Sequence, residues 1–356
     1  MTIQTFGLTT GRLNRFKGAI LKHAQPLEVL GKTGRQVSFP KNNSDTYVAR
    51  RWLPYGATST SANTQNRFFV DGTTDRVTDV IQAHQTQEGV TSTPDSITPV
   101  DVTVVMQQYD CLYGFTDKTF DLYEDDVPQA MIEQVGERVT FVNEMILYGA
   151  LKAGTNIFYG GTGTSVATVN GGLTLGFVRK IAKNLMANHG QPVNTMLKAS
   201  PNYGTDAVAP GFNVYASTDL EPDIRDIAGF IPAEKYATGT AQPYEIGKVE
   251  RFRFILTPDL PSKQDAGAAV GATGLSSTTG TNIDVYTVIV AAKDAWSQVA
   301  VRGKESLKPT YLPPGQQSKS DPHGQRGYAG TIWWKAVMLE NNGWMAVAHV
   351  GSKTLS

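Results

Sequence analysis

One stretch, residues 124–154, constrains the fold of this chain most, because its sequence is typical of one long helix with clear ends. Three acidic residues lie at its start, where the helix dipole is positive, and Pro128 falls in the first turn. Gly154 supplies a stop at the other end. At about 1.5 Å per residue the helix would be about 45 Å long, which is more than the core of a compact domain needs.

The apolar residues of this stretch recur every three or four positions and predict a single buried stripe. The stripe consists of Val127, Met131, Val135, Val139, Val142, Ile146 and Ala150. The residues expected off the stripe are Gln134, Glu137, Arg138, Asn143 and Glu144. Helix capping explains the acidic start better than an acid–base pair does, and this start consists of Glu124, Asp125 and Asp126. An ordinary amphipathic helix in a globular core fits the same pattern.

The composition describes a folded protein with many turns. Hydrophobic residues make up 40% of the 356 and charged residues 18%, and there are 35 glycines and 18 prolines. The 32 basic and 32 acidic residues cancel, which argues against a protein whose whole surface binds nucleic acid. The charge is uneven, because residues 1–51 carry nine basic and two acidic side chains and the remainder is correspondingly acidic. The length allows two domains, or one domain with long excursions.

The first hundred residues predict an arm followed by a projecting hairpin. Residues 1–45 lack sustained periodicity apart from a short helix at Leu13–His23, and the arm is either a solvated tail or a segment that crosses a neighbouring subunit. Residues 47–55 and 97–109 predict two strands. More than forty residues, mostly polar, lie between them, and a loop of that length is usually functional.

Beyond the long helix the pattern predicts a second helix and a mixed α/β unit. Residues 173–189 predict an amphipathic helix that buries Phe177, Ile181, Leu185 and Met186. The glycine-rich stretch 160–172 lacks the Gly-Lys-Ser/Thr of a phosphate loop, so we expect a flexible connector. Further strands are expected at residues 211–216, 248–257 and 284–292, with a helix at 221–227.

Two more segments have distinct compositions. Residues 266–282 contain mostly Gly, Ala, Ser and Thr, and we expect a mobile loop. Residues 328–351 predict two strands around Asn341-Asn342-Gly343, a sequence that favours a hairpin turn.

No catalytic, cofactor or metal site is predicted. Cys111 is the single cysteine, which excludes an intramolecular disulfide and a cysteine-cluster zinc site, and we expect it to be a small buried side chain. The histidines show no metal-ligand spacing, and they are His23, His84, His189, His323 and His349. Residues 1–18 lack the apolar core of a signal peptide, so we expect none, and no apolar run approaches the ~18 residues of a membrane span.

The order of these segments resembles that of the major capsid proteins of tailed bacteriophages, which share the Hong-Kong-ninety-seven fold. In detail the chain is similar to the branch typified by the major capsid protein of phage N-four. Besides the long helix, the residues that carry the resemblance are VTVVMQQYDCLYGFTDKTFDL at 102–122, EIGKVERFRFILTPDL at 245–260, DVYTVIVAAKDAWSQVAVRGKESLKPTYL at 284–312 and SDPHGQRGYAGTIWWKAVMLENNGWMAVAHVGS at 320–352. None of these is a catalytic signature, so their order and spacing carry the resemblance.

The resemblance implies an α+β fold and a role for each segment. Residues 1–45 would be the N-terminal arm, 46–98 the extended β-hairpin loop, 99–189 and 313–356 the peripheral domain with its spine helix at 124–154, and 190–312 the α/β axial domain. The C-terminal strands would return to the sheet of the peripheral domain.

The implied function is structural, with neither catalysis nor a cofactor. Copies of the chain would form pentamers and hexamers of an icosahedral shell, first a procapsid and then the mature head, around double-stranded DNA. The shell would assemble in the bacterial host cytoplasm, without a membrane, and would include a portal and, in some relatives, a decoration protein. The different alternatives are an encapsulin-like compartment that encloses a cargo enzyme, and a soluble enzyme with a pocket in residues 190–312.

Two departures from relatives define the expected subtype. No lysine occurs between Lys41 and Lys118, so we expect no covalent cross-link through an extended-loop lysine. Strand-like sequence begins by Tyr47, which leaves no room for a scaffolding extension, so we expect a separate scaffolding protein.

Overall fold

The computed structural model describes residues 28–40, 44–55, 96–123, 126–195, 207–236, 241–271, 273–301 and 307–354, with short pieces between 67 and 94. The predicted helix Leu13–His23 and the acidic residues Glu124 and Asp125 lie outside the described residues.

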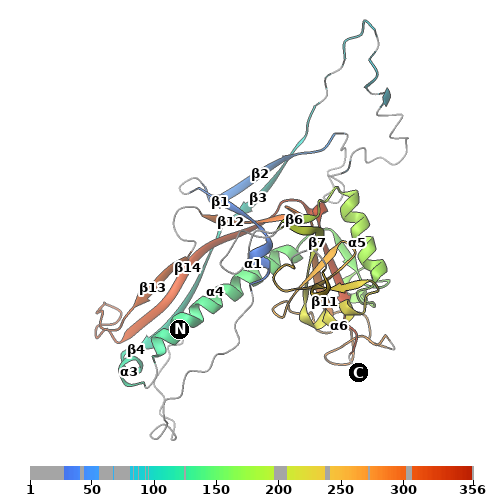
Figure 1. Ribbon diagram of the computed structural model, residues 1–356. Coiled ribbons are helices and arrows are strands. Elements are labelled where there is room, and N and C mark those ends of the chain that lie inside the picture. The colour runs from blue at the N-terminus through green and yellow to red at the C-terminus, as the bar shows by residue number, and fades with distance from the viewer. Residues whose placement is uncertain are drawn as a thin grey trace.

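Two β-sheets joined by a long helix organise the chain (Figure 1). The five-stranded sheet has the order β1-β12-β14-β13, with β4 paired to β14. Its strands are β1 (Arg35–Phe39), β4 (Gln107–Thr116), β12 (Trp296–Val301), β13 (Leu307–Leu312) and β14 (Arg326–Leu339). A separate two-stranded ribbon consists of β2 (Thr46–Trp52) and β3 (Pro99–Val105).

The eight-stranded sheet has the order β5-β15-β11-β7-β10-β9-β8, with β6 paired to β7. Its strands are β5 (Ile157–Tyr159), β6 (Val193–Thr195), β7 (Ala207–Ser217), β8 (Phe230–Pro232), β9 (Glu245–Val249), β10 (Phe252–Thr257), β11 (Val285–Ala291) and β15 (Met345–Gly351). The helices α5 (Leu175–Ala187) and α6 (Glu221–Arg225) pack on one face of this sheet through one apolar cluster. Met186, which we expected on the buried side of α5, is 42% exposed.

The long helix α4 spans Val127–Lys152 and so is shorter at both ends than the predicted 124–154. Asp126 is its N-cap, and the Asp126 carboxylate accepts a hydrogen bond from the backbone N–H of Gln129 at 3.1 Å. Pro128 lies in the first turn, as predicted. Figure 1 shows α4 running from the five-stranded sheet to the eight-stranded sheet.

The buried face of α4 changes sides along the helix. In the first half, Val135 and Val139 pack against Trp333 of the five-stranded sheet. In the second half, Leu147 and Leu151 pack in the cluster that contains strand residues of the eight-stranded sheet. At about 100° per residue, Val135 and Leu151 point about 160° apart around the helix axis.

The predicted single stripe is therefore right for the first half of α4 and wrong for the second. Val142, Ile146 and Ala150 are only partly buried, whereas Glu144, expected off the stripe, is 1% exposed. The physical reason is that one helix has two different packing partners, and each partner selects its own face.

The predicted C-terminal hairpin is wrong, because β14 and β15 belong to different sheets. The turn itself forms, since the Asn341 side chain accepts a hydrogen bond from the N–H of Gly343 at 3.1 Å and the 3-10 turn η5 (Asn342–Trp344) follows. Every residue of β15 is buried, and β15 pairs with β11 on one side and β5 on the other. An apolar strand of this kind is more stable inside a sheet than on the edge of a hairpin.

The strand predicted at 248–257 is two strands. β9 and β10 form an antiparallel pair in which Val249 lies opposite Phe252, and Glu250 in the turn has a φ of 51°. The two charged residues of the turn, Glu250 and Arg251, interrupt what reads as one β-rich run.

The two glycine-rich loops are packed, contrary to the expected mobility. A Cβ atom at Gly171 would lie 2.6 Å from the Cα of Gly161, so the glycines allow two backbone segments to touch. At the two ends of the second loop, the Asp284 carboxylate accepts a hydrogen bond from the N–H of Asp265 at 2.8 Å, and within the loop Leu275 is 6% exposed. Backbone and carboxylate hydrogen bonds thus hold segments that look flexible by composition.

The sheets divide the chain at different residues from the expected domain boundaries at 189/190 and 312/313. Residues 157–187 and strand β15 belong with the eight-stranded sheet, whereas β12 and β13 belong with the five-stranded sheet. Of the two C-terminal strands, only β14 joins the sheet that packs on the first half of α4. These segments belong to a different unit from the expected one because pairing between distant strands, and not sequence order, decides which sheet a strand joins.

Candidate assembly surfaces

The ribbon presents an exposed face on which large apolar side chains alternate with polar and charged ones. β2 and β3 pair antiparallel from Thr46 opposite Val105 to Trp52 opposite Pro99. Because side chains alternate along each strand, one face carries Val48, Trp52 and Val105, which are 51%, 54% and 45% exposed. Figure 1 shows the ribbon beside β1 and β12 and away from the eight-stranded sheet, and an isolated two-stranded ribbon is marginally stable in water.

The other face of the ribbon is anchored at its base. Tyr47, Val102 and Val104 pack against Phe39 and Met338 of the five-stranded sheet. On the exposed face Arg50 forms an ion pair with Asp101 across the two strands, at 2.7 Å. This pair is open to solvent and contributes little stability, but it pins the strand register.

A second group of residues lies where residues 28–36, the first described segment, contact α4. We call it the arm joint, and it consists of residues 28–36 with Glu144, Gln298 and Glu340. The buried Glu144 carboxylate accepts hydrogen bonds from three consecutive backbone N–H groups, those of Val29, Leu30 and Gly31, at 3.0, 2.6 and 3.2 Å. These residues begin the short helix α1 (Leu30–Thr33).

Burial raises the pKa of Glu144 above its ordinary value, although the three backbone hydrogen bonds oppose that change. The nearby Lys335 has a lowered pKa, because its burial outweighs the attraction of Glu28 and Glu144. The arm joint therefore holds charged groups in a poorly solvated site.

Glu340 connects the arm joint to the ribbon. Its carboxylate accepts a hydrogen bond from the Arg35 guanidinium in β1 at 3.1 Å, and its backbone carbonyl accepts one from Arg51 in β2 at 3.4 Å. The start of β1 and the far end of β2 are therefore tied to the same residue.

Sequence reasoning missed Glu144, although a signal for it exists. Glu144 is the only charged residue between Arg138 and Lys152, in the run VTFVNEMILYGAL. A single carboxylate in such a run is a candidate for a buried group with specific partners.

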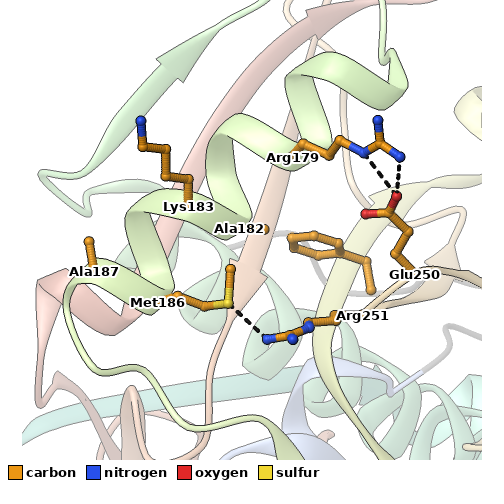
Figure 2. Close-up of a pocket in the computed structure, with 8 residues that line it drawn as sticks. Arg179, Ala182, Lys183, Met186, Ala187, Glu250 and Arg251 are labelled. Atoms are coloured by element: carbon orange, nitrogen blue, oxygen red, sulfur yellow. Dashed lines mark hydrogen bonds and ion pairs between the residues drawn. The ribbon is translucent and has the colours of Figure 1, made fainter.

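A hollow of the eight-stranded unit lies between α5 and the β9–β10 turn, and Figure 2 shows the side chains that line it. Arg179 is paired with Glu250 through its Nε at 2.9 Å, and Arg251 contacts the Met186 sulfur at 2.8 Å. Its floor is apolar, with Ala182 and Phe252. These groups do not include a nucleophile with an adjacent base, so the hollow offers no recognisable catalytic arrangement.

The other residues considered at sequence level lie apart. Cys111 is buried in β4, where burial raises the pKa of its thiol. His349 is buried in β15, its Nδ1 lies 3.2 Å from the Thr287 hydroxyl, and its ring stacks on Tyr159. His84, His189 and His323 are exposed, and His23 lies outside the described residues.

Two searches concern the described part of the chain only. It contains no group of three or more His, Cys, Asp or Glu side chains placed to hold a metal ion. None of its helices has both the length and the apolar character needed to cross a bilayer.

Known proteins resemble the chain in sequence and in fold. No model of a known protein family matches it. It is 22% identical over 263 residues to a protein named major capsid protein from Pseudomonas phage KPP21, a match that covers 68% of this chain and 65% of the relative. The chain thus spans slightly less than two thirds of the length of that relative.

Several solved structures are similar over nearly the full chain. The capsid of Ralstonia phage GP4 matches with a TM-score of 0.63 and 11% identity, covering 99% of this chain and 100% of that one. The capsid of cyanophage Pam1 matches with a TM-score of 0.61 and 12% identity, covering 99% and 100%. The head structure of Helicobacter pylori bacteriophage KHP40 gives 0.58 and 11%, covering 97% and 96%. The predicted α+β, Hong-Kong-ninety-seven-like fold is confirmed.

Proposed function

We propose that this chain is the major capsid protein of a tailed bacteriophage. Copies of it assemble as pentamers and hexamers into an icosahedral shell that encloses double-stranded DNA, first as a procapsid and then as the mature head. The observation that carries the proposal is the group of large apolar side chains exposed on the ribbon, in a fold shared with phage capsids. A face with Trp52 and Val48 exposed is stabilised when a neighbouring copy covers it.

Assembly needs only modest affinity at each contact. A subunit in a closed shell touches several neighbours at once, so the contacts act together and the shell is far more stable than one pair of subunits. The exposed apolar side chains of the ribbon offer one such contact.

The structural units fit the roles in such a shell. The five-stranded sheet with the first half of α4 is the peripheral domain, and α4 is its spine helix. The eight-stranded sheet with α5 and α6 is the axial domain, which surrounds the five-fold and six-fold positions. The ribbon with residues 53–98 is the extended loop.

The proposed partners follow from this role. Besides further copies of the chain, they are a separate scaffolding protein, a portal and, where present, a decoration protein, with non-specific contact to packaged DNA. The protein is a non-enzymatic component of the virion, it assembles in the host cytoplasm, and its extended loop forms no lysine cross-link.

Electron microscopy tests the proposal. The purified protein is expressed with and without the neighbouring open reading frames of its genome and examined by negative stain. We expect closed polyhedral particles, or rings of five and six, and nuclease-protected DNA in particles from infected cells. A uniform small oligomer under every condition would refute the proposal.

A matched pair of variants tests the ribbon. Trp52→Ser removes an exposed ribbon side chain, whereas Ile231→Ser removes a 42% exposed side chain of β8. Both subunits should fold, and only Trp52→Ser should lose closed particles. Particles of normal size and yield from Trp52→Ser would show that the ribbon is not an intersubunit surface.

An encapsulin-like compartment is the second candidate. It uses the same fold, so the contents of the particle distinguish the two: co-purifying cargo protein would favour the compartment, and DNA the phage head. The phage origin of the relatives described above favours the head.

A further inference from the structure

The burial of the Glu144 carboxylate costs free energy. A carboxylate that is 1% exposed gives up its hydration, and a well-packed apolar side chain at such a position often leaves a protein equally or more stable. Its environment also includes Glu28, whose charge raises the Glu144 pKa further. A role in stability alone therefore explains Glu144 poorly, and its hydrogen bonds point to a role in orienting the backbone of residues 29–31.

The hydrogen bonds of Glu144 fix an orientation and not merely a contact. Oε1 accepts from Val29 and Leu30, and Oε2 accepts from Gly31, so both oxygens are used by three consecutive N–H groups. Three donors that converge on one carboxylate constrain the orientation of the backbone, because hydrogen bonds weaken steeply when they are bent. An apolar side chain could hold this segment against α4 but could not set the orientation of its backbone.

Further contacts join this orientation to the rest of the subunit. The Gln298 side chain in β12 donates to the carbonyl of Gly31 at 2.7 Å. A few residues later Arg35 is paired with Glu340, whose carbonyl also accepts from Arg51 of the ribbon. Residues 29–35 are therefore held against α4, β12 and the end of β14, and Glu340 also contacts the far end of β2.

We propose that Glu144 is a positioning residue for assembly, which fixes the backbone of residues 29–31, and with it the point to which the basic segment 1–27 is joined, relative to the ribbon. This inference rests on the proposed capsid function. Residues 1–27 contain four basic and no acidic side chains, namely Arg12, Arg15, Lys17 and Lys22. A basic segment attaches to many acidic surfaces at low specificity, so a fixed attachment point favours the neighbour that lies within its reach.

The first test measures local opening of the arm joint. Glu144→Gln is close in size but removes the charge, and Glu133→Gln makes the same change at an exposed position of α4. Trypsin cleavage after Lys32 is followed by mass spectrometry, with cleavage after Lys183 in α5 as the internal reference. Weakening charge-assisted hydrogen bonds should accelerate cleavage after Lys32 by about 10- to 100-fold. The rate after Lys183, and both rates in Glu133→Gln, should remain unchanged.

The second test examines the particles. We expect uniform closed particles from wild type and Glu133→Gln, and open or irregular shells from folded Glu144→Gln subunits. Uniform particles from Glu144→Gln, or equal acceleration at Lys32 and Lys183, would overturn the positioning role. If wild type itself forms no shells, the capsid proposal fails, whereas the cleavage result still decides whether Glu144 holds residues 29–31.

A milder variant covers the case in which Glu144→Gln does not fold. Gln298→Ala removes only the side-chain hydrogen bond to the Gly31 carbonyl. It should accelerate cleavage after Lys32 several-fold and broaden the distribution of particle diameters. Unchanged cleavage and particle diameters in Gln298→Ala would then refute the proposal.

Discussion

The change of buried face along α4 predicts which of two apolar residues in its second half, Ile146 or Leu151, contributes more to stability. A single continuous stripe would make Ile146→Ala the more costly substitution and leave Leu151 off the core. The structure predicts the opposite order, because Leu151 is 0% exposed and packs with Ile289, Met345 and Val347, whereas Ile146 is only half-buried.

The magnitudes follow from burial. Leu151→Ala removes a fully enclosed side chain and leaves a cavity, so the free energy of unfolding should fall by about 2–5 kcal/mol. Ile146→Ala loses only part of its transfer energy and leaves no closed cavity, so we expect about 1 kcal/mol. Ile132→Ala, at a 44% exposed position of the same helix, should cost no more than Ile146→Ala.

Urea unfolding of the dissociated subunit, followed by tryptophan fluorescence, measures these differences. The slope of the free energy with urea should stay constant, so the midpoints alone should report the order. A loss for Ile146→Ala equal to or larger than that for Leu151→Ala would refute the two-faced packing of α4.

Two further predictions concern acid and the helix interior. Burial, with Lys263 and Lys152 nearby, lowers the pKa of His349 from 6.5 to about 4. As the pH falls, the His349 imidazole takes up a proton in the unfolded chain before it does so in the folded protein. The contribution of His349 to the free energy of unfolding should therefore be full above pH 6.5 and fall by about 3 kcal/mol as the pH drops towards 4. His349→Gln should show a weaker dependence of this free energy on pH over that window, and an unchanged dependence would assign the acid sensitivity to other groups. Gly136→Ala should raise the unfolding free energy by about 1 kcal/mol, since a Cβ there meets no atom within 4 Å and Ala favours helix; a lower midpoint would mean that this position needs glycine.

Local signals predicted the elements of this fold well. The start of α4 was predictable because an N-cap carboxylate and a proline in the first turn act within one turn of helix. The turn at Asn341 formed for the same kind of reason. Such features depend only on residues that are close together in the chain, so a single sequence is enough to predict them.

Partners were much less predictable than elements. The sequence shows that Val135 and Leu147 are apolar residues of one helix, but its periodicity does not show that two sheets lie on opposite sides of that helix. In the same way, the strands beside the Asn341 turn read as a hairpin, although each pairs with strands distant in sequence. Glu144 escaped notice because its donors lie more than a hundred residues away.

The position of β15 has a consequence for how the protein is made. Strand β15 lies inside the eight-stranded sheet between β5 and β11, and β14 lies inside the other sheet between β12 and β4. A chain emerging from the ribosome therefore cannot close either sheet until residues 326–351 are free. Until then α4 lacks Trp333 on one side and Val347 on the other. Nascent subunits crowded on one messenger RNA thus lack the finished surfaces by which completed copies recognise each other, and each chain matures as an individual before it joins others.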